Sequence, residues 1–258
     1  ELVLTNEDEQ GTYILKPIPR DLLRVKEVPA NEHLTMQIAK QLYKIETAKN
    51  ALVFFRDGSP AYLTKRFDVK KDGSKIGIED FASLAGKSSH NGGSNFKYDY
   101  SYEELGKLII KFIPAWRVEI EKYFKLVLFN YLFSNGDAHL KNFSIIETRI
   151  GDYKLSPAYD LINTKLHVDD SPFALSKGLF KDDYKSERYK TIGRPSIDDF
   201  KEFGRRVGVK ENRIDKLLDP YLKIPPELDT LINNSFLSDK SKRGYRLMYN
   251  TRRNTLSK

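Results

Sequence analysis

The seven residues "GDAHLKN" at 136–142 bring together side chains that could transfer a phosphoryl group. Asp137 and Asn142 stand five positions apart, and Asp160 follows in "PAYDL". Magnesium prefers oxygen ligands in near-octahedral geometry, so Asn142 and Asp160 are candidate ligands alongside phosphate oxygens and water. Asp137 is a candidate base that would orient an acceptor hydroxyl and take its proton. The spacing therefore predicts magnesium-dependent phosphoryl transfer.

The order of the surrounding elements strengthens this prediction. A D-x-x-x-x-N pattern alone is weak, because Asp and Asn often close turns and cap helices. Here the loop leaves the apolar stretch "YFKLVLFNYLFSN", and two short strands are expected at 142–148 and 152–158, directly before Asp160. An apolar helix, a loop, a hairpin and a metal-binding aspartate follow one another in this order in a protein-kinase active site.

A lysine and a glutamate far upstream complete the candidate site. Lys16 in "YILKP" lies in a predicted strand, where a lysine is unusual unless the strand is an edge or its end is wet. It could contact nucleotide phosphates as a point charge. Glu32, at the start of a helix expected at 31–43, is a candidate ion-pair partner for Lys16. An acid in a first helical turn is, however, also favoured by the helix dipole.

His139 and Lys141 are the remaining candidate catalytic residues. A histidine two positions after Asp137 either braces the loop backbone by hydrogen bonds or takes part in the chemistry, and both interpretations stay open. Lys141 could neutralise the charge of the phosphoryl group in transit, because charge stabilisation dominates this chemistry.

The elements that must position these residues fall into two groups, and the first is rich in strands. Short β-branched and apolar runs between polar turns predict strands, and apolar residues at four-residue intervals predict a helix. Strands are expected at 2–5, 12–18, 51–56 and 60–67, with the helix at 31–43 between them.

The second group is helical. A short helix is expected at 78–86, a polar loop at 87–95, and a helix at 101–113 that opens with a capping box. The segment 115–133 is apolar on nearly every side, which predicts a helix buried at the centre of its lobe. Three more short helices are expected at 196–208, 211–222 and 226–238.

Together these elements predict an α+β protein with a two-lobed, protein-kinase-like fold. A small β-rich N-terminal lobe, which would bind ATP, is expected at 1–68, a linker or hinge region at 69–78, and a larger α-helical lobe at 79–258. The catalytic loop would span 135–143 in the helical lobe. Two lobes imply a cleft between them.

Composition limits the other classes of protein. The 258 residues include no cysteine, which excludes disulfides and thiolate metal sites and suits a reducing cytosol. The four histidines are scattered, so no structural zinc site is expected. No run approaches the ~18 apolar residues of a membrane span. The net charge is +8, and 239–258 carries seven Lys or Arg against one acid. This tail is either a solvated helix or a docking surface for an acidic partner or nucleic acid.

Several motifs taken together resemble the HipA-like serine/threonine kinases. They are, in order, "LKP", "NEHLTMQIAKQL", "YLTKRFD", "EDFASLAGK", "SNGDAHLKNFSII" and "YKLSPAYDLINT", and the likeness covers roughly residues 1–180. The resemblance implies ATP and Mg²⁺ as cofactors. It implies that Asp137 is the catalytic base, that Asn142 and Asp160 hold magnesium, and that Lys16 binds phosphate.

Adenine recognition and the N-terminus are where the sequence departs from this family. The resemblance implies that the backbone of Lys65 and Phe67 contacts adenine, although the family often has an acid where Lys65 stands. Family members also place a glycine-containing phosphate loop and a subdomain before the position of Glu1. Because the chain starts with Glu1 and not with Met, we expect it to be a fragment that lacks both.

The resemblance also implies partners. Family members phosphorylate proteins, notably aminoacyl-tRNA synthetases, usually beside a DNA-binding antitoxin, and a smaller branch acts on host cells. We therefore expect a protein substrate, an antitoxin-type partner and a cytoplasmic location, with export as an effector left open. Direct nucleic-acid binding through the basic tail also stays open.

Three functions remain open on the sequence. The first is an ATP- and magnesium-dependent serine/threonine protein kinase, with autophosphorylation as an addition. The second is a small-molecule phosphotransferase of the same superfold, whose acceptor pocket could use the acids Asp169, Asp170, Asp182 and Asp183. The third is a kinase-like binding module without turnover, which would act through its basic tail.

Overall fold

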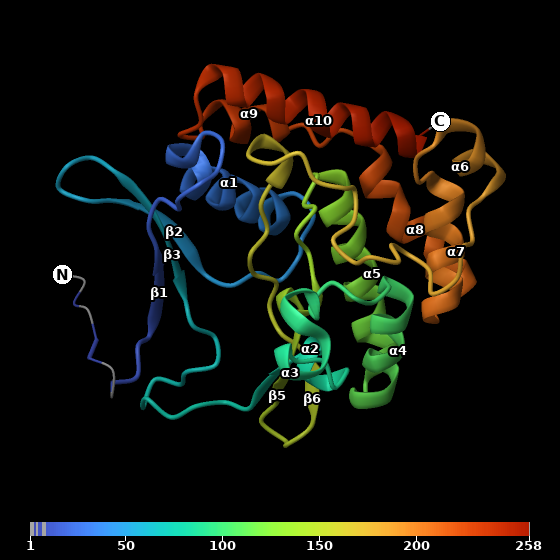
Figure 1. The fold of residues 1–258 in the computed structure, drawn as a ribbon, viewed down its shortest axis with the longest axis horizontal. Helices are drawn as coiled ribbons and strands as arrows, with labels where there is room; N and C mark the ends of the chain where they lie inside the picture. The colour runs from blue at the N-terminus through green and yellow to red at the C-terminus, as the bar shows by residue number, and fades with distance from the viewer. Residues whose placement is uncertain (1–2, 4, 7–8, 258) are drawn as a thin grey trace.

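A small sheet and one helix form the first part of the protein. The computed structural model describes residues 3, 5–6 and 9–257. The sheet has the order β1-β3-β2, with β1 (Tyr13–Lys16) and β2 (Asn50–Phe54) each antiparallel to β3 (Pro60–Lys65). Helix α1 (Val28–Gln41) packs on β2 and β3 and lies between this sheet and the helical body (Figure 1). Lys16 is the last residue of an edge strand, one of the few places where a strand tolerates a lysine.

A second three-stranded sheet lies on the helical body. It has the order β4-β5-β6, from β4 (Ile78–Asp80), β5 (Ser144–Glu147) and β6 (Tyr153–Leu155), and both pairs are antiparallel. The β5–β6 hairpin is the predicted one. It separates the 136–142 loop from Asp160, so it fixes the distance between the two ends of the candidate site.

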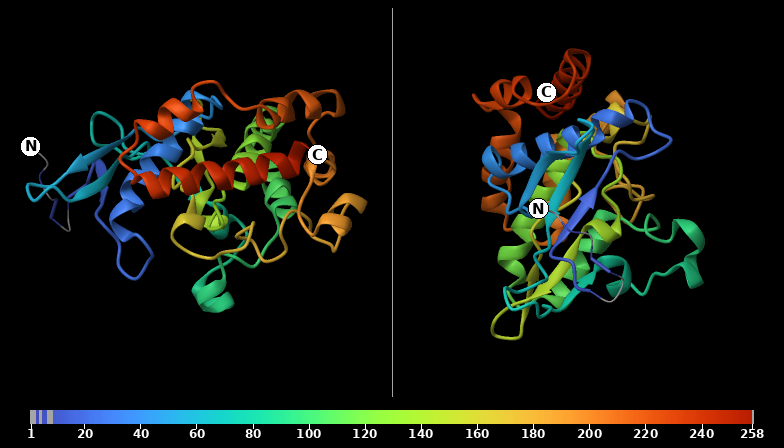
Figure 2. Two further views of the ribbon diagram at one scale, coloured as in Figure 1. Left: turned by 90° about the horizontal axis from the view of Figure 1, so that it is seen from above. Right: turned by 90° about the vertical axis from the view of Figure 1, so that its left-hand side faces the viewer.

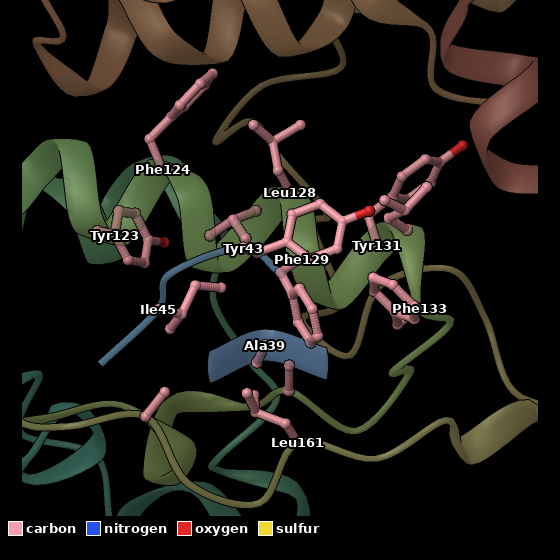
Figure 3. Packing of buried hydrophobic residues seen from close by; sticks show 14 of the residues in the cluster. Ala39, Tyr43, Ile45, Tyr123, Phe124, Leu128, Phe129, Tyr131, Phe133 and Leu161 are labelled. Atoms are coloured by element: carbon pink, nitrogen blue, oxygen red, sulfur yellow. The ribbon is translucent and has the colours of Figure 1, made fainter. Parts of the chain in front are cut away.

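The helical body is built around α5 (Trp116–Leu132), which follows α4 (Tyr102–Phe112). The ring of Tyr43 packs edge-on against the rings of Phe129, in α5, and Phe133, directly after α5 (Figure 3). The ring centroids of these two pairs are 5.4 and 5.5 Å apart. The other helices are α2 (Phe81–Leu84), α3 (Ser89–Gly92), α6 (Glu187–Ile192), α7 (Ile197–Val207), α8 (Glu211–Leu222), α9 (Leu228–Asn233) and α10 (Asp239–Ser257). Short 3₁₀ turns lie at Val25–Glu27, Gly93–Asn95, Leu140–Asn142 and Thr164–Leu166.

The fold class expected from the sequence is confirmed, and so are the capping box of α4 and the burial of α5. Three local expectations are wrong. The segment 78–86 is a strand followed by one helical turn, and the 87–95 loop contains α3 and a 3₁₀ turn. Helix α1 starts at Val28, before the expected position. Half of the strand expected at 2–5 lies outside the described residues, so that strand stays a prediction; its described residues, Val3 and Thr5, are not in a strand.

The basic tail is the long helix α10, which runs along the outside of the molecule (Figures 1 and 2). Tyr245 in α10 is fully buried and its hydroxyl lies 2.9 Å from that of Thr35 in α1. Arg246 pairs with Asp229 at 2.6 Å, and Arg252 lies over the ring of Tyr131. Part of the tail's charge therefore stabilises the fold. Across the described part of the chain, no helix combines the length and apolar character that a bilayer crossing needs.

A buried asparagine joins α1 to the loop that follows Asp160. The amide nitrogen of Asn31 donates to the backbone oxygen of Asn163 at 2.8 Å, and its oxygen accepts from the Asn163 N–H at 3.3 Å. Asn31 is fully buried and directly precedes Glu32. This contact therefore fixes two candidate site segments relative to each other.

We expect Asn31→Ala to lower the free energy of unfolding by about 3 kcal/mol, because it leaves the buried Asn163 N–H unpaired and leaves the Asn163 oxygen with only the longer hydrogen bond from the Leu166 N–H. Urea unfolding would measure the loss. Gln41→Ala, an exposed change at the end of the same helix, is the control and should cost less than about 0.5 kcal/mol. Equal stability of the two variants would contradict the assigned role of Asn31.

Candidate active site

One cavity of about 240 Å³ gathers most of the predicted site residues. Strand β1, helix α1, the 135–142 loop and the segment after β6 all contribute to it. Its lining residues are Lys16, Glu32, Asn135, Asp137, His139, Asn142, Asp160 and Ile162. Larger cavities exist elsewhere in the protein, but this one concentrates charged side chains from segments far apart in sequence.

Lys16 joins three of these segments. Its ammonium nitrogen lies 2.8 Å from Glu32 Oε1 and also pairs with the carboxylate of Asp160. Because α1 starts at Val28, Glu32 is in its second turn, so the dipole of a first turn does not explain the acid. Glu32 is only 5% exposed, and its side chain points to a lysine 16 positions away. The expected Lys16–Glu32 ion pair is therefore present.

Burial and charge act against each other in this ion-paired group. Burial raises the pKa of Glu32 to about 7, because the Lys16 ammonium offsets only part of the cost of burying the carboxylate and Asp160 adds a second negative charge. Burial opposes the charge on Lys16, but the carboxylates of Glu32 and Asp160 outweigh it and raise the lysine pKa. Lys16 therefore keeps its positive charge in the cavity.

Asp160 presents its carboxylate to positively charged or donor groups on both sides. One oxygen pairs with Lys16, and Oδ2 accepts from the Asn142 amide nitrogen at 3.1 Å. Asp160 also has a φ of 56°, in the left-handed region that costs most residues energy and often marks a functional position. The lysine occupies the place beside Asp160 that a cation would favour.

Asn142 and Asp160 fit a magnesium ion by the chemistry of their oxygens. The Asn142 amide would have to turn to offer its oxygen, because its nitrogen faces Asp160 and its oxygen accepts from the His139 backbone N–H. Among the residues the structure describes, no three His, Cys, Asp or Glu side chains gather into a preformed metal centre. An ion held by one carboxylate and one amide would have to take its other ligands from phosphate oxygens and water. That is the usual way for magnesium to bind with a nucleotide.

Asp137 is exposed at the mouth of the cavity and is held from two sides. The Tyr98 hydroxyl donates to Asp137 Oδ1 at 2.8 Å, and the Asp137 N–H donates to Asn135 Oδ1 at 3.2 Å. Burial and the nearby carboxylate of Asp137 raise the pKa of Tyr98, so the phenol stays a donor. The carboxylate is thereby oriented before any acceptor binds.

His139 is buried, and burial lowers its pKa, so its ring is neutral near pH 7. Its backbone N–H donates to Asn142 Oδ1 at 3.0 Å, and its ring packs edge-on against that of Tyr98 at 5.2 Å. Its Nδ1 has no hydrogen-bond partner among the described residues. The backbone of His139 therefore positions the Asn142 amide, and the ring packs on Tyr98 with one nitrogen atom unused.

Three predicted residues do not line this cavity. Lys141 is exposed, and its backbone oxygen accepts from the Tyr159 hydroxyl at 2.8 Å. The Lys65 N–H donates to the backbone oxygen of Lys49 at 2.7 Å, so that donor is already used within the first sheet. The ring of Phe67 lies 5.8 Å from that of Tyr159. Their predicted roles stay predictions.

Four residues that contribute to the site were not predicted. Asn135 and Ile162 line the cavity, Tyr98 orients Asp137, and Tyr159 packs on Phe67 beside Asp160. Three of them stand within two positions of Asp137 or Asp160 in the sequence, namely Asn135, Tyr159 and Ile162. Their closeness to predicted residues could have indicated them. Tyr98 lies 39 positions before Asp137, and the sequence holds no comparable signal for that contact.

The raised pKa of Glu32 predicts a pH-dependent stability. Between pH 4.5 and about 7 the folded protein binds a proton that the unfolded chain has released, so this group's contribution to the free energy of unfolding falls as pH rises. We expect the free energy of unfolding of the wild type to fall by on the order of 3 kcal/mol, relative to that of Glu32→Gln, as the pH rises through this window. Urea unfolding at several pH values would measure it, and a constant difference would contradict it.

The family model for the HipA-like C-terminal domain matches residues 2–225. Curated relatives agree with it. A Haemophilus influenzae protein named "Putative kinase" is 28% identical over 89% of this chain and 70% of its own. "Putative kinase Y4mE" of Sinorhizobium fredii is 28% identical over 85% of this chain and 50% of its own, so the chain spans only half of that relative.

Two solved structures share the fold. HipA of Shewanella oneidensis, in a complex with HipB and operator DNA, has a TM-score of 0.69 at 21% identity. The aligned part covers 94% of this chain and 57% of the HipA chain. The Helicobacter pylori proinflammatory kinase CtkA has a TM-score of 0.61 at 16% identity, covering 95% of this chain and 87% of its own. The family model matches most of the length of this chain, so the chain belongs to the HipA-like C-terminal domain family, and the curated relatives described above are named as kinases.

Proposed function

We propose that the protein is a serine/threonine protein kinase that uses ATP and Mg²⁺ to phosphorylate a protein hydroxyl. One observation carries the proposal: a lysine paired with a buried glutamate and with Asp160 shares a cavity with Asp137 and Asn142. A purely structural ion pair would not need a neighbouring exposed aspartate oriented by a phenol. The family and the fold support the same activity.

Each cavity residue has one task in this proposal. Lys16 contacts the phosphates, and Glu32 keeps it in place. Asn142 and Asp160 hold magnesium, which would neutralise charge on the phosphates. Asp137 orients the acceptor hydroxyl and accepts its proton, a step in which position matters more than basicity because the transition state is loose.

The residues around the cavity have secondary tasks. The backbone of Lys65 and Phe67 would bind adenine, with the rings of Phe67 and Tyr159 as a wall. His139 braces the loop, and its free Nδ1 is a donor or acceptor for the phosphate side. Lys141 is exposed and would have to turn inward to neutralise the phosphoryl group.

The partners belong to the same proposal. The Shewanella relative assembles with HipB and operator DNA, which supports an antitoxin-type partner for this chain. The substrate would be a protein such as an aminoacyl-tRNA synthetase or a host protein, with autophosphorylation as an added activity. We place the protein in the cytoplasm.

A small-molecule phosphotransferase is the second candidate function, and the positions of its acids weigh against it. Of the four acids considered, Asp170 lies next to Asp137. Asp169 pairs with Lys165, and Asp182 pairs with Arg206 at 2.8 Å. The four acids therefore do not gather into one acceptor pocket beside Asp137: Asp182 and Asp183 line a different cavity, which three lysines also line.

We expect Asp137→Ala and Asp160→Ala each to lower phosphotransfer from γ-labelled ATP at least about 100-fold, because one removes the base and the other a metal ligand. Asp169→Ala is the control, since that side chain is 97% exposed and lies outside the cavity. Unchanged thermal unfolding would show that the variants fold. Full activity in either site variant would reject the assignment.

A further inference from the structure

A second cavity, of about 510 Å³, adjoins the first and shares Asp137 and Ile162 with it. The two cavities differ in chemistry. The first is lined by Lys16, Glu32 and the candidate metal ligands, whereas the second has walls from Leu22, Val28, Ile162 and Val168. We call this second cavity the apolar groove. Asp137 therefore stands where a charged cavity meets an apolar one.

The walls of the apolar groove are fixed before any ligand binds. Leu23 N–H donates to the backbone oxygen of His167 at 3.3 Å, and His167 Nδ1 lies 2.8 Å from the backbone oxygen of Leu23. His167 Nε2 lies 2.9 Å from the amide nitrogen of Asn31, which can only donate. The histidine is therefore neutral, and it ties the loop that carries Leu22 to the turn that carries Val168.

The charge of the apolar groove has one sign. Asp137 and Asp170 are the two acidic side chains among the described residues that line it, and no lysine or arginine is among those lining residues. A Cβ atom at Gly136 would lie 2.3 Å from an oxygen of Asp170 and 2.6 Å from the backbone oxygen of Ser171, so Asp170 is packed against the catalytic loop. An acidic side chain entering the groove would be repelled, whereas an apolar one would bury its surface.

We propose that the apolar groove binds an apolar side chain two positions from the acceptor Ser or Thr in an extended protein segment. The inference rests on the proposed kinase function and adds a substrate class to it. In an extended segment successive side chains point to opposite faces, so the side chain two positions away lies on the same face as the acceptor hydroxyl, about 7 Å along the chain. A hydroxyl at Asp137 therefore directs that side chain into the cavity that Asp137 shares with Leu22 and Val168.

The test uses acceptor peptides and a change of charge in the groove. The probes are serine peptides of one sequence in which both residues two positions from the serine are Leu, Ala or Asp. We expect kcat/KM at least about tenfold higher for Leu than for Asp with the wild type. Val168→Lys should reverse that order without changing the KM for ATP, because Val168 is 36% exposed and lies outside the charged cavity. Leu247→Lys, which adds the same charge on the outer face of α10, is the matched control and should keep the wild-type order.

Phosphosites mapped in a treated cell lysate give the same readout when short peptides are poor acceptors. Enrichment of apolar residues two positions from the phosphosite with the wild type, shifted toward acidic residues there in Val168→Lys, supports the proposal. Sites that show no preference in both proteins would overturn it and leave the kinase function standing. Phosphorylation of an aminoglycoside but of no peptide or protein would overturn the proposed function itself, and this inference with it.

Discussion

The Lys16 ammonium between two carboxylates is the contact on which the rest of the site depends. It joins the end of edge strand β1, the second turn of α1 and the segment after the β5–β6 hairpin. Glu32 is too buried to carry a charge at low cost without this lysine. Three segments separated by up to 144 positions are therefore held together by one positive charge.

The surrounding structure keeps this group in register. Asn31 binds the backbone of Asn163 and lies next to Glu32, so α1 and the loop after Asp160 are held at a second point. The hairpin spaces Asp137 from Asp160, and the buried helix α5 leads directly into the 135–143 loop that carries Asp137. The charged cavity is thus built from rigid elements, whereas Asp137 itself depends on a hydrogen bond from Tyr98.

Much of this arrangement could be predicted from the sequence, because its signals are local. The order of strand lysine, helical glutamate, loop aspartate and post-hairpin aspartate is written along the chain. What could not be predicted depends on contacts between distant segments. Tyr98 reaches Asp137 from the stretch between the loop expected at 87–95 and the helix expected at 101–113, for which the sequence predicts no element. The apolar groove likewise depends on the contact of His167 with Leu23, which lie 144 positions apart in the chain. Strand β4 is three residues long and exists only because β5 pairs with it.

The central claim is that the Lys16 group binds magnesium and nucleotide together. Calorimetric titration with a non-hydrolysable ATP analogue, with and without Mg²⁺, tests it most directly on the wild type, on Lys16→Met and on the exposed control Lys190→Met. The account predicts magnesium-dependent binding that is about tenfold or more weaker in Lys16→Met and unchanged in Lys190→Met, because a hydrogen bond to a charged group contributes roughly 1.5–3 kcal/mol. Equal affinity in all three proteins, or binding indifferent to magnesium, would contradict it.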